Sequence, residues 1–284
     1  MAIDCVVLDF DGTFTQVEEE AAPFEEVYRS NVADLLGRNV DEAWQREAAW
    51  IRGRPNEFGW NVDGKIVAPA TSDPYLLSTA IAHRVFDAAG VLKNRVFRAE
   101  IAQALYREAY KYTRTSFKPE AKRVLEALLA TDARVFVVTN SHTEVVARKL
   151  DELNPTGRER LEVVGDAKKY VIDEPVLGPD DGAFASVPET RDLPGLPRPV
   201  YLRRGRYYEA LRRIWNETGA CAERTLVCGD IYELDLALPE ALGAHIHLIV
   251  GACTLPFERH AIEVAGARGG MSPTLEALPA RLRA

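Results

Sequence analysis

The sequence predicts an α/β protein: a doubly wound, Rossmann-like parallel sheet with an all-helical domain inserted into it. From residue 120 onward, short apolar segments alternate with amphipathic helical patterns. This alternation is typical of a parallel sheet covered by helices on both faces. Between residues 17 and 115, apolar residues recur at helical spacing and no convincing strand appears. We therefore expect a helical domain planted after the first strand.

The strands of the sheet are expected in short apolar segments without polar alternation, as in parallel strands buried on both faces. These segments are residues 3–9, 134–138, 161–164, 225–228 and 246–250. The clearest connecting helices are 119–129, 144–153 and 207–217. The sheet domain is thus expected to combine residues 1–16 with residues 116–284.

The inserted domain, residues 17–115, is interpreted as two helical halves. The Ser72-Asp73-Pro74 sequence predicts a helix start, because a capping side chain precedes a proline in the first turn. The Gly- and Pro-containing segment 53–69 is predicted to be a loop between the halves. A second irregular segment, 173–199, lies within the sheet domain and is predicted to be a flap or loop, because such long loops often serve a function.

Composition and charge limit the classes of function. The chain has 284 residues, of which 47% are hydrophobic, so it can bury a substantial core. A net charge of −8 disfavours nucleic acid as a partner. No apolar run approaches the ~20 residues that a membrane helix needs, and Asp4 stands where a secretory peptide would be basic. A cytoplasmic protein without a membrane partner is expected; the oligomeric state is left open.

The four cysteines give no evidence of a metal or disulfide framework. They are scattered through the chain, with no CxxC pair and no Cys/His cluster. This pattern argues against both a disulfide scaffold and a zinc site.

Two carboxylates follow the first strand directly, in the sequence VVLDFDGTFT at residues 6–15. On an extended chain, positions i and i+2 point to the same face, so Asp9 and Asp11 would repel each other. A dry core cannot hold such a pair without a positive partner. The alternative is a plain Asp-Gly turn at Asp11-Gly12. The sequence therefore indicates a cation near Asp9, unless the segment is only a turn.

Polar residues also follow three other predicted strands. The carboxyl ends of parallel strands meet at one edge of the sheet, where ligands bind at the point of strand-order reversal. We expect one site containing Asp9, Asp11, Thr139, a lysine, Asp230 and Asp235.

This ordered set resembles the haloacid dehalogenase superfamily. The resemblance rests on DFDGT at 9–13, Thr139 after an apolar strand, a downstream lysine, and GDIYELD at 229–235. The helical insertion after the first strand resembles the cap domain of that superfamily. A cap of this kind would close over the substrate and exclude water.

The resemblance implies a role for each matching residue. Asp9 would be the nucleophile that forms an aspartyl-phosphate, and Asp11 the general acid and base. Thr139 and the lysine would hold phosphoryl oxygens. Asp9, the backbone carbonyl of Asp11 and Asp230 would bind Mg²⁺, a cation that favours oxygen ligands. Asp235 would orient that metal shell.

The residue at position 11 separates branches of the superfamily. The name-giving dehalogenases carry tyrosine there and phosphonoacetaldehyde hydrolases carry alanine, whereas aspartate resembles the phosphatases and phosphomutases. The expected function is Mg²⁺-dependent hydrolysis of a small phosphomonoester, such as a nucleotide or sugar phosphate. A phosphomutase, or a binding protein that lost turnover, remains an alternative.

The identity of the catalytic lysine leaves two possibilities. Many relatives carry a Lys-Pro pair ahead of the helix that leads to the motif corresponding to GDIYELD. At that position this chain has YLRRGRYYEAL, with arginines at 203, 204 and 206 and no lysine. The segment VVGDAKKY instead resembles DARKP of cytosolic purine 5′-nucleotidases, with Tyr170 in place of the proline. On that comparison Lys169 takes the role. Candidates for substrate contact are Gly12, Asn140, Arg204 and Arg206.

Overall fold

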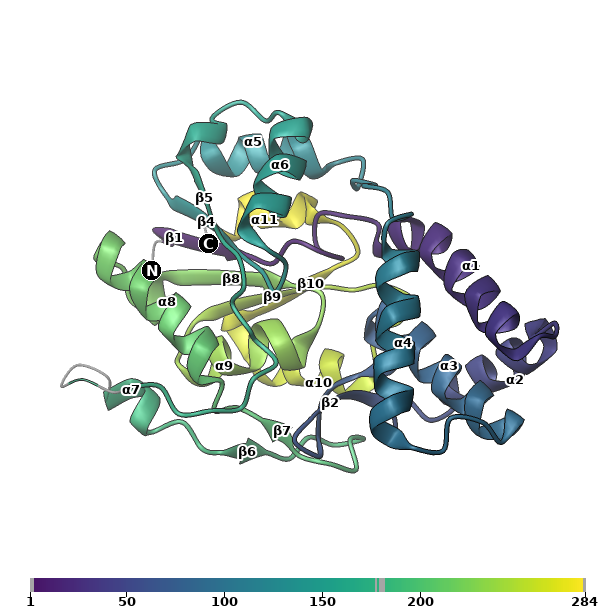
Figure 1. Ribbon diagram of the computed structural model, residues 1–284. Coiled ribbons are helices and arrows are strands. Elements are labelled where there is room, and N and C mark those ends of the chain that lie inside the picture. Colours follow the sequence, from purple (N-terminus) through teal and green to yellow (C-terminus); the bar gives the residue numbers. More distant parts are fainter. Residues whose placement is uncertain (1–2, 177, 179–181, 283–284) are drawn as a thin grey trace. The chain divides into compact units, whose positions relative to one another are not determined.

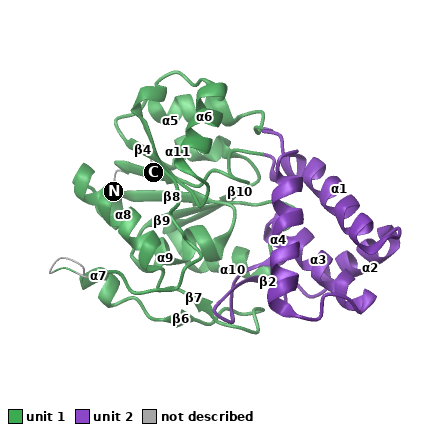
Figure 2. Cartoon of the chain, in the orientation of Figure 1, with its two compact units in different colours: residues 1–15, 117–284 green, residues 16–116 purple. Residues whose placement is uncertain are grey.

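The computed structural model describes residues 3–176, 178 and 182–282. Contacts divide the chain into two compact units, Met1–Thr15 with Phe117–Ala284, and Gln16–Ser116 (Figures 1 and 2). We call the first the α/β unit and the second the inserted unit. Residues 177 and 179–181, part of the segment predicted to be a flap or loop, lie outside the described residues.

The α/β unit is built on a six-stranded sheet in the order β10-β9-β8-β1-β4-β5, with every neighbouring pair parallel. Its strands are β1 (Cys5–Leu8), β4 (Arg134–Val138), β5 (Leu161–Val164), β8 (Thr225–Gly229), β9 (His245–Ile249) and β10 (Gly269–Ser272). The α/β prediction is confirmed. Sequence reasoning missed β10, because glycines are poor strand formers and this edge strand is defined by its pairing with β9.

Register at the centre of the sheet brings three strand ends together. Leu8, the last residue of β1, pairs with Val137 on one side and Cys228 on the other. The residues that follow β1, β4 and β8 therefore emerge side by side at the carboxyl edge.

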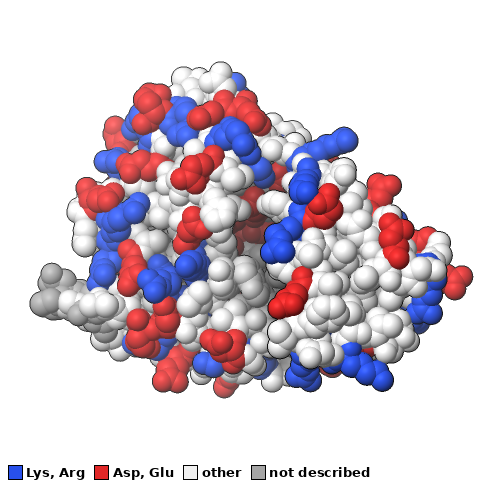
Figure 3. Space-filling model, in the orientation of Figure 1, with Lys and Arg blue, Asp and Glu red and all other residues white. Residues whose placement is uncertain are grey.

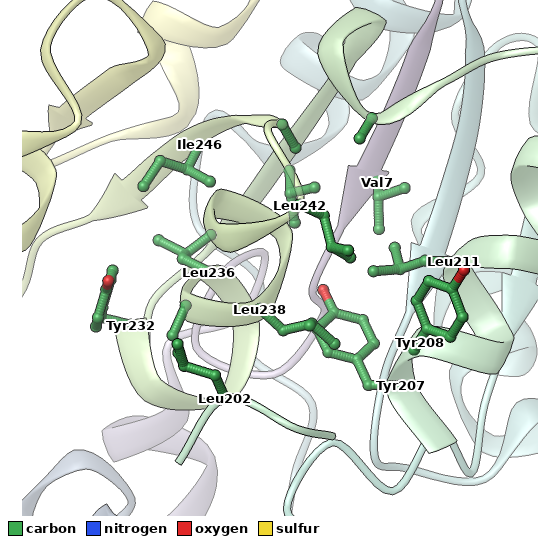
Figure 4. Packing of buried hydrophobic residues seen from close by; sticks show 14 of the residues in the cluster. Val7, Leu202, Tyr207, Tyr208, Leu211, Tyr232, Leu236, Leu238, Leu242 and Ile246 are labelled. Carbon is green, nitrogen blue, oxygen red and sulfur yellow. The ribbon is translucent and has the colours of Figure 1, made fainter. Parts of the chain in front are cut away.

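Helices and their apolar faces cover both sides of this sheet. The helices are α5 (Ala121–Leu129), α6 (Thr143–Leu153), α7 (Gly182–Ala185), α8 (Gly205–Thr218), α9 (Ala237–Ala241), α10 (Pro256–Val264) and α11 (Leu278–Arg281). Val7 packs in one core cluster with Tyr207 and Leu211 of α8 (Figure 4). Val6 and Leu8 belong to the cluster on the opposite face. The fully apolar β1 is explained by this two-sided burial.

Short 3₁₀ helices and one π-helical turn complete the connections. The 3₁₀ helices are Ala70–Ser72, Arg158–Arg160, Ala222–Arg224, Gly266–Arg268 and Leu275–Ala277. The π-helical turn, Tyr232–Leu236, begins shortly after β8 ends at Gly229. Such turns are rare and occur frequently at functional sites.

The irregular segment after β5 packs on the core where it is described. It contains α7 and a two-stranded antiparallel pair, β6 (Thr190–Arg191) and β7 (Val200–Tyr201). Phe184, Val187 and Leu196 are buried in the same cluster as α8. These contacts explain how a Pro- and Gly-rich stretch can have a defined path.

The inserted unit consists of four long helices and a hairpin. The helices are α1 (Val17–Leu36), α2 (Asp41–Arg52), α3 (Pro74–Ala89) and α4 (Arg95–Tyr110). The predicted start of α3 is confirmed: the Asp73 carboxylate accepts hydrogen bonds from the backbone N–H groups of Tyr75 (2.7 Å) and Leu76 (3.0 Å).

The expectation of an all-helical insertion needs one correction. The segment predicted as a loop contains an antiparallel hairpin, β2 (Gly59–Val62) and β3 (Lys65–Pro69). Asp63 and Gly64 connect the strands with φ angles of 50° and 80°. An Asp-Gly pair favours this two-residue turn, so the sequence contains a signal for the hairpin.

Charges of both signs are interspersed on the face shown in Figure 3. Among the described residues, no helix has the length and apolar character required to cross a bilayer.

Candidate active site

Asp9 lies at the carboxyl end of β1, the centre of the sheet. Its backbone N–H donates to the Cys228 carbonyl at 2.8 Å, which continues the strand pairing by one residue. The residue is buried, with 8% of its surface exposed. Its Oδ1 accepts a hydrogen bond from Lys169 Nζ at 2.7 Å, and its Oδ2 accepts one from Thr13 Oγ1 at 3.2 Å. The sheet therefore presents a buried carboxylate with a cation on one side.

Lys169 is the lysine that reaches this site. It is 1% exposed, and its Nζ also donates to Asp235 Oδ1 at 2.8 Å. Burial alone would lower the pKa of Lys169, but Asp235 and Asp9 outweigh burial and the pKa is raised. The ammonium is thus held charged between two carboxylates. The neighbouring Lys168 is exposed and has a φ of 46°.

The loop after β5 delivers Lys169 through contacts with the loop after β4. The Ala167 N–H donates to the Thr139 carbonyl at 3.0 Å, and the Lys169 N–H donates to Asn140 Oδ1 at 2.8 Å. Thr139 is buried, and its Oγ1 accepts from the Ser141 N–H at 3.1 Å. Asn140, predicted to contact substrate, thus uses its Oδ1 to hold the lysine loop.

Asp230 directly follows β8, and Asp235 lies within the π-helical turn Tyr232–Leu236. Asp235 Oδ2 accepts from the Ile231 N–H at 3.0 Å, so both oxygens of Asp235 are engaged by protein donors. Asp230 Oδ1, by contrast, is buried and has no hydrogen-bond partner among the described residues. A buried carboxylate oxygen with no hydrogen-bond partner is the type of ligand atom that a cation site requires.

Two glycines make room for these carboxylates. A Cβ on Gly12, whose φ is 79°, would lie 2.1 Å from Asp230 Oδ2. A Cβ on Gly229 would lie 2.4 Å from the Asp235 Cβ. Gly12, predicted to contact substrate, therefore permits the close approach of the Asp230 side chain.

The carboxylates of Asp9, Asp230 and Asp235 fit a hard divalent cation. One oxygen from each lies within 4.8 Å of the others. Burial, Asp9 and Asp235 raise the pKa of Asp230 well above its usual range. Burial also raises the pKa of Asp9 to about 7, against the opposing effect of Lys169. Lys169 beside Asp9, and Lys118, whose charge acts on Asp230, do not balance the three carboxylates. Carboxylate oxygens are the ligands that Mg²⁺ prefers. Both oxygens of Asp9 and of Asp235 accept hydrogen bonds from protein donors, whereas Asp230 Oδ1 has no partner among the described residues. Asp230 is therefore the side chain best placed to hold the metal, with Asp9 beside it.

The Asp11 side chain is not among the three clustered carboxylates, although its charge contributes to the raised pKa of Asp9. Strand β1 ends at Leu8 and Asp11 lies in a turn, so the strand alternation does not extend to it. Its Oδ2 accepts from Ser141 Oγ at 2.7 Å, and its Oδ1 lies 3.7 Å from Lys149 Nζ. Sequence reasoning missed Lys149, since nothing distinguished it from other charged residues of a helix.

Lys118 is a second lysine that the sequence did not single out. Its Nζ donates to the Gly12 carbonyl at 2.7 Å. It therefore fixes the turn that carries Asp11.

The structure does not bring Arg204 or Arg206 into contact with Asp9. The Arg204 guanidinium is buried and donates to main-chain carbonyls, and Arg206 forms an exposed ion pair with Asp173 at 3.1 Å. Of the two candidates for the role of the lysine, Lys169 is the one next to Asp9.

The protein has a parallel α/β sheet with a buried carboxylate cluster at its central carboxyl edge, where open α/β sheets bind their ligands. The chain belongs to the haloacid dehalogenase-like hydrolases, because the model of that family matches residues 3–243. This confirms the resemblance seen in the sequence. No curated protein matches the chain.

Solved structures of the family share the fold at low identity. A protein described as a predicted phosphoglycolate phosphatase from Haemophilus somnus is 14% identical, with 97% of this chain and 96% of that chain covered and a TM-score of 0.55. The HAD-hydrolase YfnB from Bacillus subtilis, bound to magnesium, is 10% identical over 100% of both chains, with a TM-score of 0.53. A haloacid dehalogenase-like hydrolase from Bacteroides fragilis is 15% identical, covering 97% and 99%, with a TM-score of 0.52.

Proposed function

We propose that the protein is a Mg²⁺-dependent phosphohydrolase that cleaves small phosphomonoesters through an aspartyl-phosphate on Asp9. The observation that carries the proposal is the Asp9 carboxylate, paired with the buried Lys169 ammonium and adjacent to the unpartnered oxygen of Asp230. This arrangement offers a nucleophile, a fixed positive charge and a metal ligand within one cluster.

Each residue has a defined part in the proposed reaction. The Asp9 carboxylate attacks phosphorus, and the ester oxygen departs with a proton from Asp11. Water then attacks the aspartyl-phosphate while Asp11 takes a proton from it, which frees Asp9 and releases phosphate. Lys169 lowers the pKa of Asp9 against the effect of burial, which favours the ionised nucleophile, and it neutralises charge on the transferring group. The bound metal would supply further neutralisation of the phosphoryl oxygens.

The location of Asp11 supports its role as acid and base. It lies beyond the metal cluster, and its side chain is 35% exposed, so it can exchange protons with solvent. Ser141 and Lys149 hold its two oxygens in place. An aspartate at this position favours phosphoryl chemistry over carbon–halogen cleavage, on the family comparison made from the sequence.

The substrate class is best tested by product. Purified protein with Mg²⁺ is incubated with p-nitrophenyl phosphate, nucleoside monophosphates or sugar phosphates, and the released phosphate is measured. In a parallel assay, chloroacetate is the substrate and the released halide is measured. We expect phosphate release only, and try nucleoside monophosphates first because of the local nucleotidase resemblance. Halide release without phosphate release would refute the proposal, and isomerised sugar phosphate without net phosphate release would indicate a phosphomutase.

Replacement of Asp11 by asparagine should lower kcat by about 10²–10⁴-fold. The nucleophile remains, but the leaving oxygen no longer receives a proton. The loss should be larger for an alkyl phosphate than for p-nitrophenyl phosphate, whose leaving group needs no acid. Asp166→Asn is the matched control, since Asp166 is an exposed aspartate in a neighbouring loop and asparagine tolerates its φ of 51°. Equal losses for both ester types would contradict the assignment.

Replacement of Lys169 by alanine should lower kcat/KM more than tenfold, which corresponds to above ~1.4 kcal/mol. Asp9 and Asp235 would lose their shared cation, and a phosphoryl oxygen its partner. Lys168→Ala, at the exposed neighbour, should lose much less. Steady-state kinetics on both variants test this prediction, with thermal unfolding to check folding. A near-normal Lys169→Ala enzyme would exclude this lysine from the reaction.

A further inference from the structure

Arg204 is a buried arginine whose contacts are with main-chain carbonyls. It is 1% exposed, immediately precedes α8, and donates from Nε to the Tyr201 carbonyl at 2.8 Å. Its Nη1 donates to the Lys169 carbonyl at 3.1 Å and its Nη2 to the Glu233 carbonyl at 3.4 Å. One guanidinium therefore joins the loop after β5 to the π-helical turn after β8.

Glu233 is itself fixed by a second arginine. Its buried carboxylate accepts two hydrogen bonds from Arg198, both at 2.6 Å, in a bidentate pair. Bidentate arginine–carboxylate pairs have a defined geometry as well as strength. Removal of one partner from such a buried pair is costly, because it leaves an uncompensated charge.

Further contacts tie the same segment to the helix after β8. Arg191 donates to Tyr232 Oη at 2.9 Å and pairs with Glu240, and Tyr232 Oη donates to Glu240 at 2.7 Å. Three arginines of the segment 190–204 thus contact residues 232–240. The segment is anchored to the part of the chain that carries Asp235.

These contacts act on the two ends of one catalytic interaction. Lys169 Nζ lies 2.8 Å from Asp235 Oδ1, while Arg204 holds the backbone of Lys169 itself and of Glu233, two residues before Asp235. A functional site needs its groups held within about 0.5 Å of the productive geometry by supporting contacts. The distance between the backbone of the loop after β5 and the backbone of the π-helical turn therefore sets the distance between the side chains of Lys169 and Asp235.

We propose that Arg204 is a positioning residue that fixes Lys169 relative to Asp235, and that Arg198 supports it through Glu233. The inference rests on the proposed function for its kinetic consequence, but not for its structural one. Arg204 donates to the carbonyls of Lys169 and Glu233, and Arg198 pairs with the Glu233 carboxylate, so both arginines act on the site through these residues. This assigns a role to the segment between Lys169 and α8.

The kinetic test compares Arg204→Met with Arg203→Met. Arg203 is the matched control, because it lies in the same segment, pairs with Glu174, and donates to the carbonyls of Phe184 and Val187 without contacting the lysine loop. With p-nitrophenyl phosphate and Mg²⁺, Arg204→Met should lower kcat about tenfold or more with a smaller change in KM, and Arg203→Met should change kcat less than twofold. Similar losses in kcat for the two variants would overturn the proposal.

A double-mutant cycle separates positioning from general destabilisation. If Arg204 acts through Lys169, the addition of Arg204→Met to Lys169→Ala should cause little further loss. Independent action would instead multiply the two losses, and that result would refute the proposal.

Hydrogen exchange gives a readout that needs no turnover. In Arg204→Met, backbone exchange in peptides covering residues 165–171 and 230–236 should become faster, whereas Arg203→Met should leave both unchanged. If wild type hydrolyses no phosphomonoester, the proposed function fails but this measurement still decides the inference; unchanged exchange in both peptides would overturn it. If Arg204→Met does not fold, Glu233→Gln weakens the Arg198 pair and should give the same effects at smaller size, and no effect on exchange would again overturn it.

Discussion

Replacement of Asp9 by asparagine should reduce hydrolysis of every phosphomonoester to the uncatalysed background. Asparagine has no carboxylate to attack phosphorus, so no aspartyl-phosphate can form. The substitution also leaves Lys169 with Asp235 as its remaining carboxylate partner and removes one carboxylate from the candidate metal cluster. Initial rates with p-nitrophenyl phosphate measure the loss directly.

The nucleophile can also be identified by its covalent product. Brief reaction of wild type with p-nitrophenyl phosphate, acid quench and peptide mass spectrometry should place the phosphoryl group on Asp9. Asp4→Asn is a suitable control, because Asp4 immediately precedes β1 and forms a partly exposed ion pair with Arg224. It should retain activity and labelling. A label on a serine or histidine would overturn the assignment of Asp9.

Removal of divalent metal should abolish turnover, and Mg²⁺ should restore it. Without a cation, the carboxylates of Asp9 and Asp230 are crowded and buried, and one oxygen of Asp230 has no partner among the described residues. Chelation followed by dialysis and addition of Mg²⁺ tests the requirement. Full activity in the presence of chelator would contradict the mechanism.

Metal binding should also be visible in stability. A ligand at one hundred times its Kd adds about 2.7 kcal/mol to the free energy of unfolding, so Mg²⁺ should raise Tm. The shift should disappear in Asp230→Asn and persist in Asp166→Asn. Retention of the full shift in Asp230→Asn would place the metal elsewhere.

Asp9 contributes to the pH dependence of the metal-free protein, as do Asp230 and Glu258, whose pKa values burial also raises. The pKa of Asp9 is raised to about 7 in the folded state, mainly by burial, above the ordinary value of 3.8. The folded state therefore binds more protons than the unfolded state between these values, and this contribution to stability is lost as pH rises toward and through 7. We expect the stabilisation by Mg²⁺ to be larger at pH 8 than at pH 6.

The sequence by itself determined the α/β class, because the strands of a parallel sheet are buried on both faces. Residues 134–138 and 161–164 are apolar runs that can be recognised without knowledge of their neighbours. The hairpin β2–β3 could have been predicted from the sequence, because the Asp-Gly pair at its turn favours a two-residue hairpin loop. The edge strand β10 was not, since Gly269 and Gly270 carry little preference of their own and the strand is defined by pairing with β9.

The sequence also identified the residues that meet at the carboxyl edge, because the end of each strand could be located. Only the tertiary structure decided which of them touch. It places Lys169 between Asp9 and Asp235, and it places Asp11 with Ser141 instead of in the carboxylate cluster.

The support around the site could not be inferred from the sequence, and Arg204 shows why. The sequence presented it as a possible substrate contact or as a replacement for the lysine. In the fold it holds the carbonyls of Lys169 and Glu233, 35 and 29 residues away. An arginine carries the same charge whether it lies on the surface, contacts a substrate or supports a catalytic residue, so its sequence position does not reveal which of these roles it has. Its role is determined by which distant backbone groups the fold brings within hydrogen-bond distance, and those contacts exist only once the sheet has formed.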